Sequence, residues 1–338
     1  MTPREAIPAL VSRRDLTREE AASVMRGIMA GAATPAQAGA ILAALAIKGP
    51  ASQELAGFAG AMREFALPFP HETKGPFLDT CGTGGDGSGT FNVSTAAAFV
   101  VAGAGLPVVK HGNRSVTSRC GSADVLTALG ARLELSPARM AGVLRATGIA
   151  FLFAPLYHPA MKYVQGVRQE LGIRTVFNLL GPLTNPAGAR IQLLGVYEPG
   201  LTRMMAEVLL LLGAERAMVV HGGGLDEITN TGPTLVAEIG DGGIREYMIE
   251  PGDFGIPVSE IDDLRGGDAA ENARIFREVL SGEKGAHRDA VLLNAGAAIF
   301  LGGLARSMAG GISCAGESID SGNALAKLGA FIDETGRA

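Results

Sequence analysis

Two short segments hold the residues whose types and spacing are best suited to chemistry. Gly82-Thr-Gly-Gly-Asp86 is a glycine loop that ends in a carboxylate. Lys110-His-Gly-Asn-Arg-Ser115, about two dozen residues later, is a basic segment with amide and hydroxyl donors. Backbone N–H groups in glycine turns and the cations of Lys and Arg both bind phosphate. Together the segments predict a site for a ligand with several phosphates and a divalent metal, as in phosphoryl-sugar chemistry.

The glycine loop also matches the dinucleotide fingerprint G-x-G-x-x-G through Gly87, but only weakly. A dinucleotide site needs an acid about 20 residues further on for the ribose hydroxyls. No Asp or Glu lies between Gly87 and Ala123, where basic residues stand instead. No Lys-Ser/Thr pair closes the loop as a Walker motif would require. A glycine turn without a ligand remains the structural alternative for this loop taken alone.

Asn92-Val-Ser-Thr95 follows the glycine loop at a predicted helix N-terminus. Free N–H groups and the helix dipole favour anions at such a position, although the same residues could be ordinary helix caps. The glycine loop just ahead favours phosphate binding. Lys110 would then supply a point charge, and Asn113 and Ser115 would supply directional donors.

Two adjacent carboxylates, Asp226 and Glu227, follow a run of three glycines. Neighbouring side chains diverge on a strand or a helix, but a glycine-flanked loop allows both to converge. Magnesium prefers oxygen ligands and keeps waters or substrate phosphates in its shell. Ser94 could complete a two-metal arrangement across a pyrophosphate, whereas a solvated surface pair is the alternative.

A third polar region contains His158, Arg168 and the turn-rich segment 178–186. His158 and Arg168 are ten residues apart, close to three helical turns, so one helix could present both to one cleft. Arg168 could then pair with a carboxylate in bidentate fashion, and the proline-containing segment could wall a pocket. A surface arginine and a capping histidine are the alternative.

The elements that must position these residues change character at Pro68-Phe-Pro70. Before it, hydroxyl residues at Thr17, Thr34 and Ser52 predict the starts of short amphipathic helices. After it, we expect strands at 77–79 and 106–109 and one ending at 219–220, with helices at 92–104 and 122–129. Such alternation predicts an α/β fold with parallel βαβ units. Ligands bind such sheets at the carboxyl ends of the strands, where both phosphate-binding segments fall.

The composition of the 338-residue chain excludes several classes of protein. Its hydrophobic fraction of 47% is typical of a folded enzyme, and its net charge of −5 argues against nucleic-acid binding. Three scattered cysteines exclude a disulfide framework or a zinc cluster, and Cys81 is predicted to be a packing residue. The longest apolar run, 96–106, is shorter than the ~20 residues that span a bilayer. No signal pattern opens the chain, so a cytoplasmic protein is expected.

Six motifs carry a resemblance to a known family. They are Gly82-Thr-Gly-Gly-Asp86, Asn92-Val-Ser-Thr95, Lys110-His-Gly-Asn-Arg-Ser115, Gly121-Ser-Ala-Asp124, Asn178-Leu-Leu-Gly-Pro-Leu-Thr-Asn-Pro186 and Asp226-Glu227. Their order and spacing resemble the anthranilate phosphoribosyltransferase family from about Ala6 onward, without a departure at a position expected to carry function. The resemblance implies a small helical domain (1–70, completed by a segment near 164–185) and a large α/β domain (71–163 and 186–338). It also implies a homodimer paired through the helical domain.

The resemblance assigns two substrates and a metal to residues of this chain. It implies that phosphoribosyl pyrophosphate is held by Gly82, Gly85, Asp86, Thr90, Asn92, Val93, Ser94, Thr95, Lys110, His111, Gly112, Asn113, Arg114, Ser115, Val116, Thr117, Ser118 and Ser122. It implies that anthranilate meets Gly82, Asn113, His158, Arg168 and Pro182. It implies two magnesium ions per subunit, tied to Ser94, Asp226 and Glu227.

The implied reaction transfers the phosphoribosyl group of 5-phosphoribosyl 1-pyrophosphate to the amine of anthranilate, in tryptophan biosynthesis. Electrostatic stabilisation by Lys110, Asp226 and Glu227 fits this chemistry, and no general base is expected. A pyrimidine nucleoside phosphorylase-like enzyme is one alternative, but it would have no use for paired acids on magnesium. A non-catalytic nucleic-acid-binding relative is another, but it should be basic and its motifs should have decayed.

Overall fold

Four helices lead the chain in the computed structural model, which describes residues 1–71, 77–115, 119–240 and 242–337. They are α1 (Pro3–Val11), α2 (Arg18–Met29), α3 (Pro35–Lys48) and α4 (Ser52–Glu64). Their N-terminal caps explain where they begin. Thr17 and Thr34 accept hydrogen bonds from the N–H groups of the third helical residues, at 3.2 and 3.3 Å. The predicted helix starts at these two threonines are therefore confirmed.

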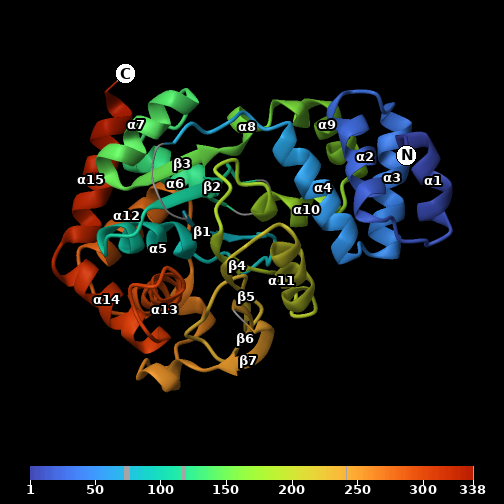
Figure 1. The fold of residues 1–338 in the computed structure, drawn as a ribbon. Helices are drawn as coiled ribbons and strands as arrows, with labels where there is room; N and C mark the ends of the chain where they lie inside the picture. The colour runs from blue at the N-terminus through green and yellow to red at the C-terminus, as the bar shows by residue number, and fades with distance from the viewer. Residues whose placement is uncertain (72–76, 116–118, 241, 338) are drawn as a thin grey trace.

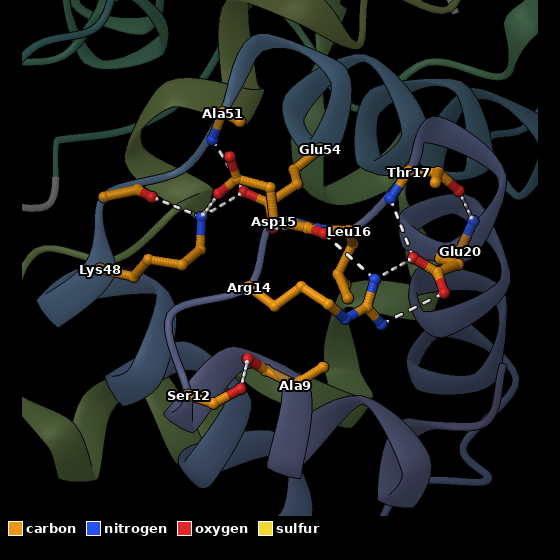
Figure 2. A network of polar contacts seen from close by, with 11 residues as sticks. Ala9, Ser12, Arg14, Asp15, Leu16, Thr17, Glu20, Lys48, Ala51 and Glu54 are labelled. Atoms are coloured by element: carbon orange, nitrogen blue, oxygen red, sulfur yellow. Dashed lines mark hydrogen bonds and ion pairs between the residues drawn. The ribbon is translucent and has the colours of Figure 1, made fainter.

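α4 begins at Ser52, as predicted, but Ala51 rather than Ser52 holds its N-cap position. Glu54 makes the difference: its fully buried carboxylate accepts from the N–H groups of Ala51 at 2.7 Å and Leu16 at 2.9 Å. The Lys48 Nζ, 2.8 Å away, neutralises it (Figure 2). A buried carboxylate is tolerated when its oxygens are hydrogen-bonded and its charge is paired, so this network fixes the α3–α4 corner.

The larger part of the molecule is built on a seven-stranded sheet with the order β3-β2-β1-β4-β5-β6-β7 (Figure 1). The strands are β1 (Leu78–Gly82), β2 (Val108–Gly112), β3 (Ile149–Phe153), β4 (Ile191–Gly195), β5 (Arg216–Gly222), β6 (Thr234–Gly240) and β7 (Gly243–Ile249). All neighbours from β3 to β5 are parallel, and β5, β6 and β7 pair antiparallel. The predicted α/β class with a mainly parallel sheet is confirmed.

Three predicted strand ends are too early. β1 continues to Gly82, β2 continues through Lys110 and His111 to Gly112, and β5 continues to Gly222. The apolar pattern stops where the polar residues begin, but the backbone pairing does not, as the register of Gly82 with Gly195 shows. Gly82, Lys110 and His111 therefore stand on strand ends rather than in loops.

Helices cover both faces of the sheet. The remaining helices are α5 (Val93–Gly103), α6 (Ser122–Leu129), α7 (Pro137–Thr147), α8 (Ala154–Tyr157), α9 (Lys162–Leu171), α10 (Phe177–Leu180), α11 (Leu201–Leu211), α12 (Ala269–Leu280), α13 (Ala286–Leu301), α14 (Met308–Asp320) and α15 (Asn323–Gly336). α5 and α13 pack on one face, and α11 packs on the other, next to α4. In the described part of the chain, no helix is long and apolar enough to cross a membrane.

Alternating residues along the strands divide the hydrophobic interior into two clusters. Leu193 and Met218 face the cluster that holds α5 and the C-terminal helices. Leu194 and Val219 face the second cluster, which also contains Phe58 of α4 and the core of the other N-terminal helices. Since side chains alternate between the faces of a strand, one sheet supplies both cores. The helical bundle therefore shares its core with one face of the sheet.

Candidate active site

The glycine loop (82–89), the N-terminus of α5 and the acid pair (Asp226 and Glu227) meet at the carboxyl edge of the sheet. The Gly84 N–H donates to Asp226 Oδ2 at 2.6 Å. The Ser94 N–H, in the first turn of α5, donates to Glu227 Oε1 at 3.1 Å. Segments from the ends of β1 and β5 are thus joined across β4. The predicted placement of the glycine loop at the carboxyl ends of the strands is confirmed.

Two glycines make room for Asp226. A Cβ atom at Gly82 would lie 2.1 Å from its Oδ2, and one at Gly195 would lie 1.5 Å from its carbonyl oxygen. Neither distance is sterically possible, so the ends of β1 and β4 must lack side chains. The sequence pattern singled out Gly82 as a ligand contact, but it gave no sign of the role of Gly195.

The acid pair is electrostatically unfavourable in the protein alone. Burial raises the pKa of Asp226, and the nearby Asp86 carboxylate raises it further. Burial also raises the pKa of Glu227, and Asp226 adds to the effect while Lys110 opposes it. Carboxylates gathered in a low-dielectric site favour a bound cation or a shared proton. The arrangement therefore suits a positively charged ligand.

The residues at this edge of the sheet fit magnesium. Asp226, Glu227 and the Ser94 hydroxyl offer only oxygen ligands, as Mg²⁺ requires. Among the residues that the structure describes, no group of three His, Cys, Asp or Glu could hold a metal alone. A site with few protein ligands leaves room for waters and substrate phosphates, which Mg²⁺ retains.

Lys110 reaches the same edge from β2. Its side chain is buried, and its Nζ donates to the Thr80 carbonyl and, at 3.3 Å, to the Ser94 hydroxyl. Asp79 lies nearby, and burial raises its pKa to about 6 while the Lys110 charge opposes that rise. The ammonium is therefore held between the strand ends and the first turn of α5.

In the first turn of α5, the polar residues that were expected to cap the helix make other contacts. Asn92 occupies the N-cap position, but its amide donates to the Cys120 carbonyl at 3.1 Å and accepts from Asn272 at 3.0 Å. Val93 and Thr95 are buried in the core. Their side chains are therefore turned away from solvent. The Val93 N–H donates to the Phe91 carbonyl at 2.8 Å and the Ser94 N–H donates to Glu227, so an anion at this turn would compete with Glu227 for the Ser94 N–H.

Further along the glycine loop, the side chain of Asp86 stabilises the turn in which it lies. Its carboxylate accepts from the Ser88 N–H at 3.1 Å and from the Ser88 hydroxyl at 2.9 Å. The Ser88 hydroxyl lies 3.3 Å from that of Thr90. Gly85 has a φ of +77°, a conformation that favours glycine. The loop is shaped by short polar contacts rather than by a packed core.

The basic segment after β2 is held by an acid that the site prediction did not include. Asp124 accepts from the Ser115 N–H at 2.9 Å and from the Arg114 guanidinium at 3.3 Å. The Asn113 carbonyl accepts from the Ser122 hydroxyl at 3.3 Å. Three further predicted donor-site residues, Val116, Thr117 and Ser118, lie outside the described residues.

Two buried histidines form a second region beside the first. The rings of His111 and His158 lie 5.1 Å apart, and His111 Nδ1 is 3.2 Å from the Gly181 carbonyl. Burial lowers the pKa of His111 to about 3, with His158 contributing, and lowers that of His158 to about 4. Both rings are therefore neutral at pH 7. Within the described residues, neither Nε2 has a hydrogen-bond partner.

His158 and Arg168 do not share a helix, so that prediction is wrong. His158 breaks the helical path (φ −118°, ψ 62°), a short 3₁₀ turn, η1 (Pro159–Met161), follows, and α9 begins at Lys162. The cause is Pro159, which cannot continue a helix from the preceding residues. Arg168, on α9, stacks its guanidinium over the Phe177 ring at 5.1 Å, and burial lowers its pKa.

The turn-rich segment 178–186 is fastened to the sheet by buried amides. The Pro182 carbonyl accepts from Gln192 Nε2 at 2.8 Å. Asn185 donates to Asp79 Oδ2 at 2.8 Å. Gln192 also contacts the Cys81 sulfur, and burial holds the pKa of that thiol well above its usual value. Cys81 is therefore a packing residue, as predicted, and segment 178–186 forms a wall beside the histidines.

Comparison with known proteins first defines the class. A model of the glycosyl transferase family α/β domain matches residues 74–325, and a model of its helical bundle domain matches residues 4–66. The fold and the site are thus those of a two-part glycosyltransferase.

Individual relatives then define the family. Anthranilate phosphoribosyltransferases from Methanocorpusculum labreanum and Rubrobacter xylanophilus are each 56% identical, covering 96% and 97% of this chain and 95% and 96% of theirs. The Thermus thermophilus structure of that enzyme matches with a TM-score of 0.93 at 46% identity, covering 98% of this chain and 99% of its own. A Saccharomyces cerevisiae structure in complex with PRPP and Mg matches at 31% identity with a TM-score of 0.91, covering 99% and 98%. The chain belongs to the anthranilate phosphoribosyltransferase family.

Proposed function

We infer that the chain transfers the phosphoribosyl group of 5-phosphoribosyl 1-pyrophosphate to the amine of anthranilate. The products are N-(5-phosphoribosyl)anthranilate and pyrophosphate, in a step of tryptophan biosynthesis. This inference rests on one observation: the glycine loop, the α5 N-terminus and the acid pair meet. Hydrogen-bond donors suited to phosphate thus lie beside ligands suited to magnesium. The full-length similarity to enzymes of this name supports it.

We propose that the donor lies along the ends of β1 and β2. Its phosphates would meet the backbone N–H groups of the glycine loop and of α5, with Lys110 and the basic segment supplying positive charge. Asp226, Glu227 and Ser94 would hold the magnesium, which we expect at two ions per subunit. The S. cerevisiae relative in complex with PRPP and Mg supports the use of magnesium in this fold. Bound magnesium offsets charge on the leaving pyrophosphate.

The reaction breaks the bond between C1 and the pyrophosphate oxygen, and the electron pair leaves with pyrophosphate. The amine nitrogen bonds to C1 and then loses a proton to solvent. His111 and His158 are too weakly basic to act as general bases at pH 7, given pKa values of about 3 and about 4. The described residues therefore favour catalysis by positioning and electrostatics.

We propose that anthranilate binds against the histidines and segment 178–186. Arg168 would pair with its carboxylate, and His158 Nε2 would meet its polar groups while Pro182, Asn113 and Gly82 line the path. An S. cerevisiae relative in complex with 4-fluoroanthranilate supports an acceptor site in this fold. The burial of Arg168 supports its role, because a half-buried guanidinium gains from a carboxylate partner.

We also propose that the chain forms a cytoplasmic homodimer through its helical domain (1–70 with 164–185). Val11 of α1, Ile47 of α3 and Tyr163 of α9 are 68%, 72% and 47% exposed. α3 packs against both α1 and α9, so these apolar side chains belong to neighbouring helices. Exposed apolar side chains on neighbouring helices support pairing there.

An anthranilate fluorescence assay tests the function. Enzyme, phosphoribosyl pyrophosphate and magnesium are combined and each is omitted in turn. We expect the signal to fall only in the complete mixture. A flat trace beside an active control enzyme would contradict the acceptor assignment, and thymidine with phosphate would then test the phosphorylase alternative.

A further inference from the structure

Arg174 lies along the chain between Arg168 and segment 178–186, which are two parts of the predicted acceptor site. α9, which carries Arg168, ends at Gly172 in a left-handed conformation (φ 60°, ψ 17°). Thr175 then begins the turn into segment 178–186, where its N–H donates to the Asn178 side chain at 3.0 Å. The short linker that holds Arg174 is therefore fixed at both ends by structure that belongs to the acceptor side.

The Arg174 side chain leaves the acceptor side and reaches the glycine loop. Its guanidinium donates to the Gly85 carbonyl and stacks on the Tyr197 ring at 4.4 Å. The Tyr197 N–H in turn donates to the Thr83 hydroxyl at 3.1 Å, and the Thr83 N–H donates to the Gly195 carbonyl at 3.0 Å. One guanidinium thus bridges the middle of the loop and the residues that anchor its start.

A restraint from outside matters for a loop of this composition. Glycines lose more conformational freedom on ordering than other residues, and this loop contains five between Gly82 and Gly89. Two carboxylates accept hydrogen bonds from the loop: Asp86, which belongs to the loop itself, and Asp226 of the proposed metal site. Among the described residues of the linker 172–176, Arg174 alone bonds to the loop.

We propose that Arg174 is a positioning residue that couples the two substrate sites, so that filling one raises affinity at the other. This rests on the proposed function. Donor binding orders the glycine loop, and Arg174 transmits that order to the linker between Arg168 and segment 178–186. The second substrate then finds its site already ordered, which produces positive coupling without a large movement.

The test measures anthranilate binding by its own fluorescence, with and without magnesium pyrophosphate, which occupies the donor site without reacting. In the wild type, we expect pyrophosphate to tighten anthranilate binding by about fivefold or more. In Arg174→Met, which keeps the length and loses the donor and the charge, the ratio should fall to about one. Arg174→Lys, which keeps a cation for the carbonyl and the ring, should retain most of the coupling.

Steady-state kinetics give a second test, because a purely structural role of Arg174 would not change the KM for phosphoribosyl pyrophosphate selectively. Arg174→Met should raise the KM for phosphoribosyl pyrophosphate roughly tenfold, while kcat changes by less than about twofold, because the lost contacts hold the loop rather than the reacting atoms. Tyr197→Phe keeps the ring and should resemble the wild type, whereas Tyr197→Leu should resemble Arg174→Met. Arg274→Met removes an arginine that pairs with Glu271 on the outer surface and is the matched control.

Three outcomes would overturn the proposal. They are a wild-type ratio near one, an unchanged ratio in Arg174→Met, and a rise in the KM for anthranilate alone. A fall in melting temperature with unchanged coupling would assign Arg174 a structural role only. Wild-type turnover in the fluorescence assay distinguishes these results from a failure of the proposed function itself.

Discussion

The donor side and the acceptor side of the site both bury titratable groups, but with opposite consequences. On the donor side, burial raises the pKa values of Asp226 and Glu227, so the anions are unfavourable without a cation. On the acceptor side, burial lowers the pKa values of His111 and His158, so both rings stay neutral. Desolvation disfavours the charged form in each case.

The difference shows which half of the site is complete in the protein alone. When ionised, the acid pair needs a cation to offset its charge. The histidines are uncharged, and among the described residues their Nε2 atoms have no hydrogen-bond partner. Donor binding should therefore depend on magnesium, and acceptor binding should depend on shape and on Arg168. Four predictions, in order of expected effect, test this contrast.

The largest effect is expected from Asp226→Asn combined with Glu227→Gln. Loss of magnesium should lower kcat by roughly 10³-fold, since electrostatic stabilisation of the leaving group is worth several kcal/mol. The double variant should also be more stable than the metal-free wild type, and magnesium should no longer raise its melting temperature. Calorimetry with and without Mg²⁺ measures this. Near-normal turnover would contradict the role of the pair.

Arg168→Ala should weaken the acceptor half alone. Losing a charge-assisted, bidentate contact should raise the KM for anthranilate by about 10- to 100-fold. The KM for phosphoribosyl pyrophosphate should stay within about twofold. Initial rates across a matrix of both substrates separate the two constants. A loss confined to the donor would contradict the assignment of Arg168.

Gly195→Ala should disturb the donor half through packing. The added Cβ would collide with the Asp226 carbonyl, and overpacking typically costs about 1–3 kcal/mol. We expect a lower melting temperature together with weaker magnesium activation. Gly200→Ala is the control, since nothing lies within 4 Å of a Cβ built there. Equal melting temperatures and equal magnesium activation in the two variants would show that the position of Asp226 does not depend on a glycine at position 195.

The smallest effect is expected from the histidines. Their folded pKa values of about 3 and about 4 lie below the ordinary 6.5. The unfolded chain therefore binds more protons below pH 6.5, and stability should fall as the pH falls from about 6.5 toward 4. His158→Gln should flatten this slope in urea unfolding, and the exposed His71→Gln should not. Identical slopes in both variants would show that His158 is not buried as a neutral ring.

The sequence predicted the fold class and the segments of the site well, because both depend on local signals. Threonine caps and alternating strands and helices are visible over a few residues, and they correctly placed α2, α3 and the carboxyl-edge site. Strand ends were missed because backbone pairing at Gly82 and Lys110 depends on neighbouring strands. Ser52 was expected to cap α4, and the N-cap falls on Ala51 instead because the buried Glu54 network joins three separate segments.

Predictions of the details of the candidate site failed where the contacting residues are far apart in the sequence. Nothing near Gly195 indicates that Asp226 will lie against it, and nothing near Arg174 points to Gly85. His158 and Arg168 matched a helical spacing, but Pro159 outweighs spacing as a signal. The residue types of the candidate site could therefore be predicted from the sequence. Which of these residues contact one another could be seen only in the folded structure.

The single core shared by the helical bundle and one face of the sheet limits how this enzyme can be recombined. Leu194 and Val219 of the sheet pack in the same cluster as Phe58 of α4. A chimera that takes its first 70 residues from one relative and its sheet from another must therefore match both sides of that cluster. A crossover at Pro68-Phe-Pro70 would leave every sequence motif intact. It would nevertheless combine helices and strands from different relatives within this one hydrophobic cluster.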